Sequence, residues 1–480
     1  MTFPPIFFEL FVLALGILIL LLETFFEKRD RKMFAVVGIV GLAVVFLFLQ
    51  ASGPGASGMA SYVVDPPAIF FKKLSVLTTI VVLIMSIDYA DTIKRFLPAD
   101  SPQAGLGEFF ALPVLTCAGM MWMSSAIDFI LIFVSLELVT ISFYVLVAYM
   151  RRNASSLEAG VKYLILSALA TGFTVYGITW IYGVTRQTNL VQISQVLPSI
   201  SVDNQPGVLF GALLVLIGLG FKIAAAPFQF WVPDVYQGAP TPITAFLSVG
   251  SKSVGFIVLL RVVQAFQSLP AVGDKLITAV ILLAVATLLY GNLAALPQTN
   301  FKRLLAYSSI GHAGYLLMAV AGISAKDSGQ AVVVYLAAYL LMTLLSFLVL
   351  VIVSNHGGGD EIVQFNGLSK RSPFLAFALL VAMMSLAGVP LTAGFLGKFM
   401  VFKVALETRQ FLLIALAIIT VGCGFYFYLK VVRAMYWQPA PANVAAIPVS
   451  KLSLAAIIIM VLLIFVLGIF PQVALGLLPA

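Results

Sequence analysis

Uninterrupted apolar runs of about 20 residues recur along the whole chain, and they restrict the fold more than any other feature. A run of that length crosses the hydrocarbon core of a bilayer as one helix. Only 10% of the 480 residues are charged, whereas about 25% would be typical of a soluble chain. The strands of a membrane β-barrel would alternate polar and apolar residues instead. The sequence therefore predicts an all-α polytopic membrane protein, with one transmembrane domain over residues 1–480.

Polar breaks divide the chain into about fourteen predicted spans. The first stretch, "MTFPPIFFELFVLALGIL", lacks the basic start of a cleaved signal peptide, so we expect it to be retained as the first helix. The approximate span cores are 6–25, 34–50, 68–88, 107–123, 127–149, 160–184, 207–230, 242–265, 276–294, 303–322, 331–354, 373–404, 411–435 and 453–476.

Basic residues favour one set of loops, and this bias predicts the orientation of the chain in the membrane. The odd-numbered loops are the richer set and should face the cytoplasm, which places both termini on the non-cytoplasmic side. The basic residues form no single patch, which argues against nucleic acid as a partner. The odd-numbered loops contain Lys28, Arg29, Lys302, Lys370 and Lys430 among others, and the even-numbered loops contain Lys72, Lys73, Arg186, Arg261, Lys275, Lys326 and Arg409.

The sequence shows no means of holding a redox cofactor on this chain. Cys117 and Cys423 lie far apart in apolar segments and form neither a CxxC pair nor part of a metal-ligand set. No glycine-rich dinucleotide loop or Walker loop is present. We therefore expect no nucleotide, flavin, metal or iron–sulfur cluster on the chain itself.

Five lysines lie inside predicted spans, and three of them are too central to reach the headgroups. Lys162 and Lys403 lie near span ends, where a long side chain can extend to the interface. Lys222, Lys252 and Lys398 would each cost at least ~2.5 kcal/mol if they faced lipid. Such residues either pair with a carboxylate for packing specificity or mark a proton or ion path, and the sequence leaves both interpretations open.

Other polar residues lie near the middle of their predicted spans, at about the same depth as the central lysines. Glu137 is the central charge of the fifth predicted helix, and His312 shares a face of the tenth with Ser308 and Tyr315. Together with the lysines they could form a polar line through the middle of the protein. A hydrogen-bonded core histidine, and serines and tyrosines that only join helices, would be the structural alternatives.

Two of the predicted helices should be discontinuous. Pro227 follows Lys222 in the seventh, and Pro390 stands with several glycines in "SLAGVPLTAGFLGKF" in the twelfth, where we expect irregular backbone between Gly388 and Gly394. The breaks are five spans apart, so a repeat of five helices would be inverted, as in many transporters. We therefore predict repeats at 107–266 (helices 4–8) and 274–436 (helices 9–13), flanked by helices 1–3 at 1–106 and helix 14 at 450–480.

Three stretches resemble the antiporter-like membrane subunits of the proton-pumping NADH:quinone oxidoreductase, respiratory complex I. The lysine at 398 and the lack of a long lateral helix after the last span point to the subunit N branch. The stretch "PDVYQGAP" departs from the acidic residue and Gly-Pro-Thr-Pro of the longer relatives, which counts more against those relatives than against subunit N. The stretches are "GFKIAAAPFQFWVPDVYQGAPTPITAFLSVGSKSVGF", "NFKRLLAYSSIGHAGYLLM" and "SLAGVPLTAGFLGKF".

The resemblance implies a subunit of a proton translocase in a bacterial inner membrane. It implies that NADH, FMN, iron–sulfur clusters and quinone are bound by partner chains, and that other membrane subunits are the neighbours. Two alternatives remain, an Mrp-type cation/proton antiporter or membrane-bound hydrogenase subunit, and a scaffold that conducts nothing. The implied proton relay consists of Glu137, Lys222, Lys252 and Lys398, with Lys162 and His312 as secondary members.

Overall fold

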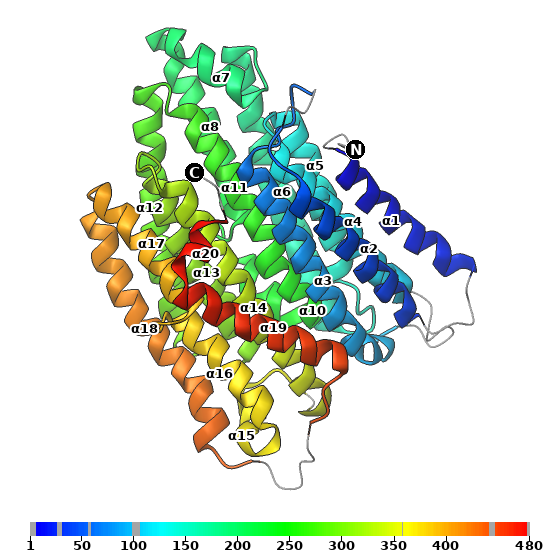
Figure 1. Ribbon diagram of the computed structural model, residues 1–480. Coiled ribbons are helices and arrows are strands. Elements are labelled where there is room, and N and C mark those ends of the chain that lie inside the picture. Colours follow the sequence, from blue (N-terminus) through cyan, green and yellow to red (C-terminus); the bar gives the residue numbers. More distant parts are fainter. Residues whose placement is uncertain are drawn as a thin grey trace.

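The computed structural model describes residues 6–25, 31–55, 59–97, 106–357, 359–440 and 447–477. These residues are almost wholly helical, as Figure 1 shows. The first half contains α1 (Phe7–Phe25), α2 (Lys32–Ala51), α3 (Pro66–Lys94), α4 (Leu106–Ser125), α5 (Phe129–Val147), α6 (Ala154–Thr185), α7 (Leu190–Val196), α8 (Gln205–Lys222), α9 (Trp231–Gly238), α10 (Thr241–Phe246) and α11 (Lys252–Phe266). The second half contains α12 (Pro270–Ala295), α13 (Phe301–Ala321), α14 (Ser328–Gly357), α15 (Leu368–Arg371), α16 (Pro373–Ala387), α17 (Ala393–Glu407), α18 (Phe411–Trp437), α19 (Lys451–Ile469) and α20 (Pro471–Leu475).

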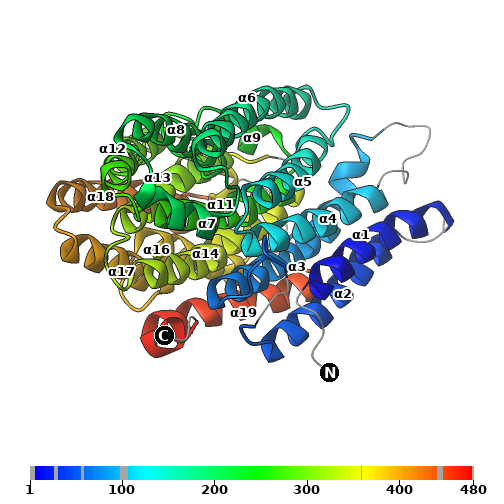
Figure 2. The same ribbon diagram turned by 90° about the horizontal axis from the view of Figure 1, so that it is seen from above.

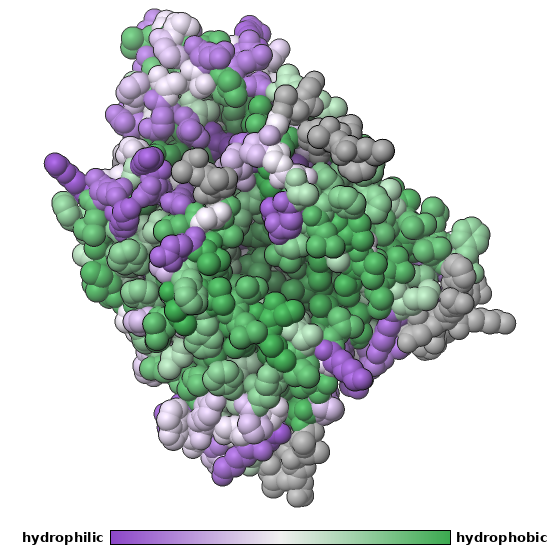
Figure 3. All heavy atoms as spheres, viewed as in Figure 1, coloured by the Kyte–Doolittle hydropathy of each residue, from purple (hydrophilic) through white to green (hydrophobic). Residues whose placement is uncertain are grey.

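The prediction of a polytopic helical membrane protein is confirmed. Thirteen helices within the described ranges are long and apolar enough to cross a membrane. The shorter helix α16 and its continuation α17 form one further, interrupted crossing, which agrees with the expected number. The visible surface carries a broad apolar belt between two polar ends, as a bilayer requires (Figure 3).

Both predicted helix interruptions are present. Helix α8 ends at Lys222 and α9 begins only at Trp231, while α16 ends at Ala387 and α17 begins at Ala393. Gly388 ends α16 with a positive φ of 90°, and its amide donates to the carbonyls of Met384 and Ser385. Glycine adopts this left-handed conformation without the steric penalty of a side chain, so it terminates the helix here.

The two broken helices lie among long, buried helices that connect the halves of the molecule. Helix α13 is buried along its whole length and packs against α9, α12, α14, α17 and α18. Helix α14 is almost as deeply buried and contacts α3, α10, α16, α17 and α19. Seen from above, the helices up to α11 lie beside those from α12 to α18, with α13 and α14 at the centre (Figure 2).

A buried ion pair that the sequence analysis missed joins α1 to α3. Lys72, which we assigned to a loop, lies in α3 with 2% of its side chain exposed, and its Nζ is 2.7 Å from Oε1 of the fully buried Glu9. The hydroxyl of Tyr62 donates to the same carboxylate oxygen at 2.7 Å. Arg261, also assigned to a loop, lies in α11 and pairs with Asp65 at 2.9 Å.

The described ends of the chain lie on one side of the molecule. In Figure 1 the first turn of α1 and helix α20 lie toward the side that carries α7, and α15 lies at the opposite side. This arrangement fits an even number of crossings. Lys28, Arg29 and the terminal residues, which bear on the predicted orientation, lie outside the described residues.

Candidate functional site

The structure brings four of the six predicted relay residues into the protein interior. Lys222, Lys252, His312 and Lys398 are all nearly inaccessible, with exposed fractions between 2% and 7%. Glu137 is only half-buried, although we expected it in the buried set. Lys162 lies at the edge of a polar vestibule and keeps 41% of its side chain exposed.

Lys222 is the last residue of α8, directly before the first helix interruption. Its Nζ donates to Oγ1 of Thr140 on α5 at 2.9 Å. Glu137 lies one turn before Thr140 on the same helix but accepts a hydrogen bond from Thr171 on α6 at 2.8 Å. In the described part of the chain, Glu137 and Lys222 are thus held by separate threonines, and no direct ion pair joins them.

Lys252 begins α11, immediately after a π-helical turn at Leu247–Ser251. Its Nζ donates to the carbonyl of Ser309 on α13 at 2.6 Å and also to the Ser309 hydroxyl. Tyr339 of α14 donates to the same hydroxyl at 2.8 Å, and the hydroxyl of Tyr236 of α9 lies 3.3 Å from it. A π-helical turn widens a helix locally and is frequent at functional sites.

His312 is held between two tyrosines. Its Nδ1 lies 2.7 Å from the hydroxyl of Tyr335 on α14, and its Nε2 lies 3.0 Å from the hydroxyl of Tyr428 on α18. Tyr428 is also hydrogen-bonded to Ser308. Each tyrosine hydroxyl can donate to the ring or accept from it, and the tautomer of His312 sets which of the two donates.

Lys398 lies one turn into α17, just after the second helix interruption. Its Nζ donates to the carbonyls of Ala387 and Leu386, at 2.7 and 3.0 Å, both from the last turn of α16. These carbonyls lose their helical donors where α16 ends. The ammonium also lies 5.3 Å from the ring centre of Tyr315. Lys398 therefore satisfies the open end of the first half-helix.

The buried groups form a row of separate hydrogen-bonded sets rather than one continuous chain. Among the described residues no hydrogen bond joins the Lys252 set to the His312 set or the His312 set to Lys398. A narrow gap bordered by His312, Tyr428, Tyr315 and Lys398 separates the last two, and it is too small for a water molecule. Proton passage along the row would require this gap to open.

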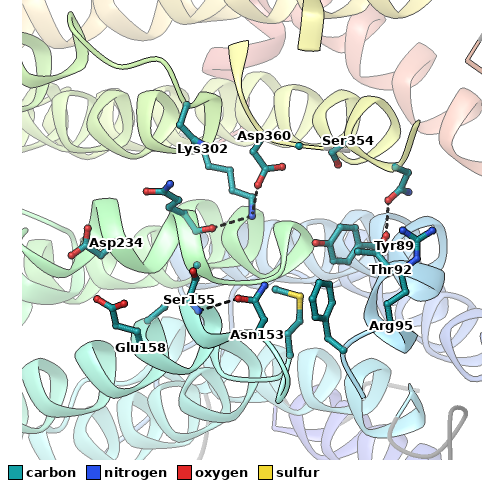
Figure 4. Close-up of a pocket in the computed structure, with 18 of the residues that line it drawn as sticks. Tyr89, Thr92, Arg95, Asn153, Ser155, Glu158, Asp234, Lys302, Ser354 and Asp360 are labelled. Atoms are coloured by element: carbon teal, nitrogen blue, oxygen red, sulfur yellow. Dashed lines mark hydrogen bonds and ion pairs between the residues drawn. The ribbon is translucent and has the colours of Figure 1, made fainter. Parts of the chain in front are cut away.

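A polar vestibule of about 560 Å³ opens on the side of the molecule where α3 and α14 end. Figure 4 shows charged side chains pointing into it from several elements. Asp234 of α9 lies at its edge and bridges the halves, since Oδ2 accepts from Lys162 of α6 at 2.7 Å and Oδ1 from Arg303 of α13 at 2.8 Å. Lys302, which we placed in a loop, pairs here with Asp360 at 3.1 Å.

Sequence reasoning missed Ser309, Tyr236 and Asp234. Serine and tyrosine are common in membrane helices, so neither residue type signalled a role. Asp234 lies in the quoted "PDVYQGAP" stretch, where an acidic residue near a helix break could have been singled out. Within the described ranges no three His, Cys, Asp or Glu side chains gather as a metal site.

Comparison with known proteins gives consistent matches. Residues 126–425 match the family model described as NADH:quinone oxidoreductase/Mrp antiporter, transmembrane. The chain is 38% identical to NADH-quinone oxidoreductase subunit N 2 of Chloroherpeton thalassium, over 96% of this chain and 91% of that one. A chain of respiratory complex I from Thermus thermophilus superposes with a TM-score of 0.81 at 31% identity, covering 98% of both chains.

A chain of the Mrp complex from Dietzia sp. DQ12-45-1b has the same fold. Its TM-score is 0.82, it covers 98% of this chain and 95% of its own, and it is 19% identical. The fold is thus shared between complex I and Mrp chains, and sequence identity distinguishes them.

Proposed function

The chain belongs to the NADH:quinone oxidoreductase/Mrp antiporter membrane family, and we propose that it is the proton-translocating subunit N of a bacterial complex I. Partner subunits carry out electron transfer from NADH to quinone, and this chain moves protons across the membrane in response. The redox groups, namely NADH, FMN, iron–sulfur clusters and quinone, are bound by those partners. Other membrane subunits of the complex and the lipid bilayer surround the chain.

The observation that carries this proposal is the set of buried lysines beside interrupted helices. Lys222 and Lys398 each flank an interruption, and Lys252 follows a π-helical turn. A packing role would need only a paired carboxylate for each lysine. Instead, the three side chains bind hydroxyls and carbonyls, none of which neutralises their charge. A lysine in such surroundings can give up its proton and regain it, which supports a relay.

We assign the relay to Glu137, Lys222, Lys252, His312 and Lys398. Glu137 acts on Lys222 from the flank of α5, through space rather than through a contact. Lys162 takes a different role from that of a buried carrier, because its charge is paired with Asp234 and Glu158 at the vestibule. The vestibule would be the entrance for protons and would face the cytoplasm, with both termini on the other side.

The two helix interruptions support a division into inverted repeats at 107–266 and 274–436. Each repeat would contribute one broken helix, α8/α9 in the first and α16/α17 in the second. Residues 1–106 and 450–480 would flank the repeats as helices 1–3 and helix 14.

Copurification tests the assignment to complex I. The chain should copurify with peripheral iron–sulfur and flavin-containing subunits, and membranes that contain the complex should oxidise NADH with quinone and acidify one compartment. Recovery with antiporter subunits alone, and no NADH oxidation, would favour the Mrp-type assembly instead. Normal proton pumping in assembled complexes that lack the buried charges would favour a scaffold.

A further inference from the structure

In the buried row, the hydroxyl of Ser309 has the most hydrogen-bond partners. Lys252 and Tyr339 both donate to it, the latter at 2.8 Å, and Tyr236 lies 3.3 Å away. These groups come from four different helices, α9, α11, α13 and α14. Ser309, Tyr236 and Tyr339 are each at most 1% exposed, and a serine with one O–H and two lone pairs can serve these three partners at once, while the hydroxyl of Ser248 lies farther off at 3.5 Å.

The direction of these hydrogen bonds depends on the charge of Lys252. A charged ammonium has no lone pair, so Lys252 must donate to Ser309. With the Tyr339 hydroxyl also donating, Ser309 has both lone pairs occupied. Its own proton is then directed at Tyr236, at 3.3 Å, rather than at Ser248, which lies 3.5 Å away and bonds to Tyr339 at 2.8 Å. If Lys252 loses its proton, its free lone pair can accept from Ser309, and Tyr236 can then donate to Ser309. One proton transfer thus reverses the whole chain.

Tyr236 connects this chain to the helix that borders the vestibule. Asp234, Gln237 and Gly238, its neighbours on α9, all line the vestibule, whereas the Tyr236 side chain is fully buried and faces Ser309 on α13. One face of this short helix therefore lines the polar vestibule, and another face contacts the buried row through Tyr236. Within the described residues, the hydrogen bonds of Lys252 reach α9 only through Ser309.

We propose that Tyr236 and Ser309 form a hydroxyl branch that loads Lys252 with protons from vestibule water. Because the Tyr236 hydroxyl is buried and does not line the vestibule, a protonated vestibule water must first enter beside α9. A proton of that hydronium ion then passes to the Tyr236 oxygen while the Tyr236 proton passes to Ser309 and the Ser309 proton passes to the neutral Lys252 amine. Three bonds to hydrogen break and three form, and neither hydroxyl keeps a charge. This assignment rests on the proposed function and adds two relay residues and an entry point to it.

Tyr236→Phe is the cleanest test, because it keeps the buried ring and removes only the hydroxyl. Proton translocation by reconstituted complexes, normalised to assembled enzyme, should fall by about tenfold or more, at the lower end of what a missing proton-transfer group causes. Ser309→Ala should lower the rate in the same way, and Ser309→Thr, which keeps a hydroxyl, should restore most of it. If Ser309→Ala does not assemble, Tyr236→Phe decides alone.

Two control variants match the tested positions. Ser253→Ala removes a buried hydroxyl beside Lys252 whose hydrogen bond among the described residues is to the carbonyl of Val249 in the preceding π-helical turn, at 2.6 Å. Tyr163→Phe removes a hydroxyl from a buried ring that packs on Trp231 of α9. Both should pump at the wild-type rate, and a loss in either equal to that of Tyr236→Phe would contradict a specific hydroxyl branch.

Lys252→Met separates this inference from the proposed function. If Lys252→Met abolishes pumping while Tyr236→Phe and Ser309→Ala pump normally, the hydroxyl branch is wrong and the relay stands. If assembled Lys252→Met complexes also pump at the wild-type rate, the proposed relay through Lys252 fails as well.

Discussion

The Nζ of Lys398 lies 2.7 Å from the carbonyl oxygen of Ala387, the last residue of α16. A spanning helix that stops in the membrane leaves carbonyls without donors, and lipid cannot supply them. Lys398 supplies donors from the following half-helix. A neutral amine still has two N–H groups, so the bonds to Ala387 and Leu386 survive the loss of one proton. The residue can therefore stabilise the break and exchange a proton.

Lys398→Met should destabilise the chain, because it leaves two buried carbonyls unpaired. Each unpaired group costs about 1–3 kcal/mol. Lys403→Met is a matched control on the same helix, since Lys403 is 43% exposed and pairs, among the described residues, with the partly exposed carboxylates of Asp327 and Glu407. Thermal unfolding of the purified complex should show a clear fall in Tm for the first variant and little change for the second. Equal values would contradict the capping role of Lys398.

Gly388→Ala should reduce proton pumping through Lys398. An added Cβ would lie 2.9 Å from Cδ of Lys398, and the positive φ of 90° would be strained by about 1–2 kcal/mol in a residue with a side chain. Lys398 would have to shift from the carbonyls that it binds. Gly422→Ala, where no atom lies within 4 Å of the new Cβ, is the control. Wild-type proton translocation per assembled Gly388→Ala complex would show that the position of Lys398 does not matter.

The buried pair of Glu9 and Lys72 should behave as a unit. Either Glu9→Gln or Lys72→Met leaves the other charge buried and should cost about 3–5 kcal/mol, seen as a low amount of assembled protein in membranes. The double variant removes both charges and should recover much of that amount. If the double variant is as poorly assembled as the sum of the two single variants, the residues do not stabilise each other.

The sequence predicted the features that depend on residue type alone. Apolar runs predicted the spans, and Pro227 and Pro390 predicted both helix interruptions, because proline lacks a donor wherever it occurs. Relationships between distant segments were not predictable. Glu9 and Lys72 meet because α1 and α3 both pack against α2 and α4, and nothing in the sequence indicated that arrangement.

In the site, too, residue type was predictable from the sequence and contacts between distant segments were not. The central lysines were found because a charge at membrane depth is costly in any fold. Their partners Thr140 and Ser309, by contrast, are ordinary hydroxyl residues that gain a role from the helices packed around them. Glu137 was expected deep inside, yet its helix turns it to a half-buried flank, because that orientation depends on how α5 meets α6.

Lys222→Arg tests most directly whether the buried lysines carry protons. Arginine keeps the positive charge and can still donate to Thr140, but it does not release its proton at any pH that the protein survives. The measurement is proton translocation by reconstituted complexes, normalised to assembled enzyme, with NADH oxidation recorded in parallel and Lys403→Arg as the control. We predict normal assembly with pumping reduced by about tenfold or more, since a proton-transfer group has been lost. Wild-type pumping by Lys222→Arg complexes would contradict the relay at its first lysine.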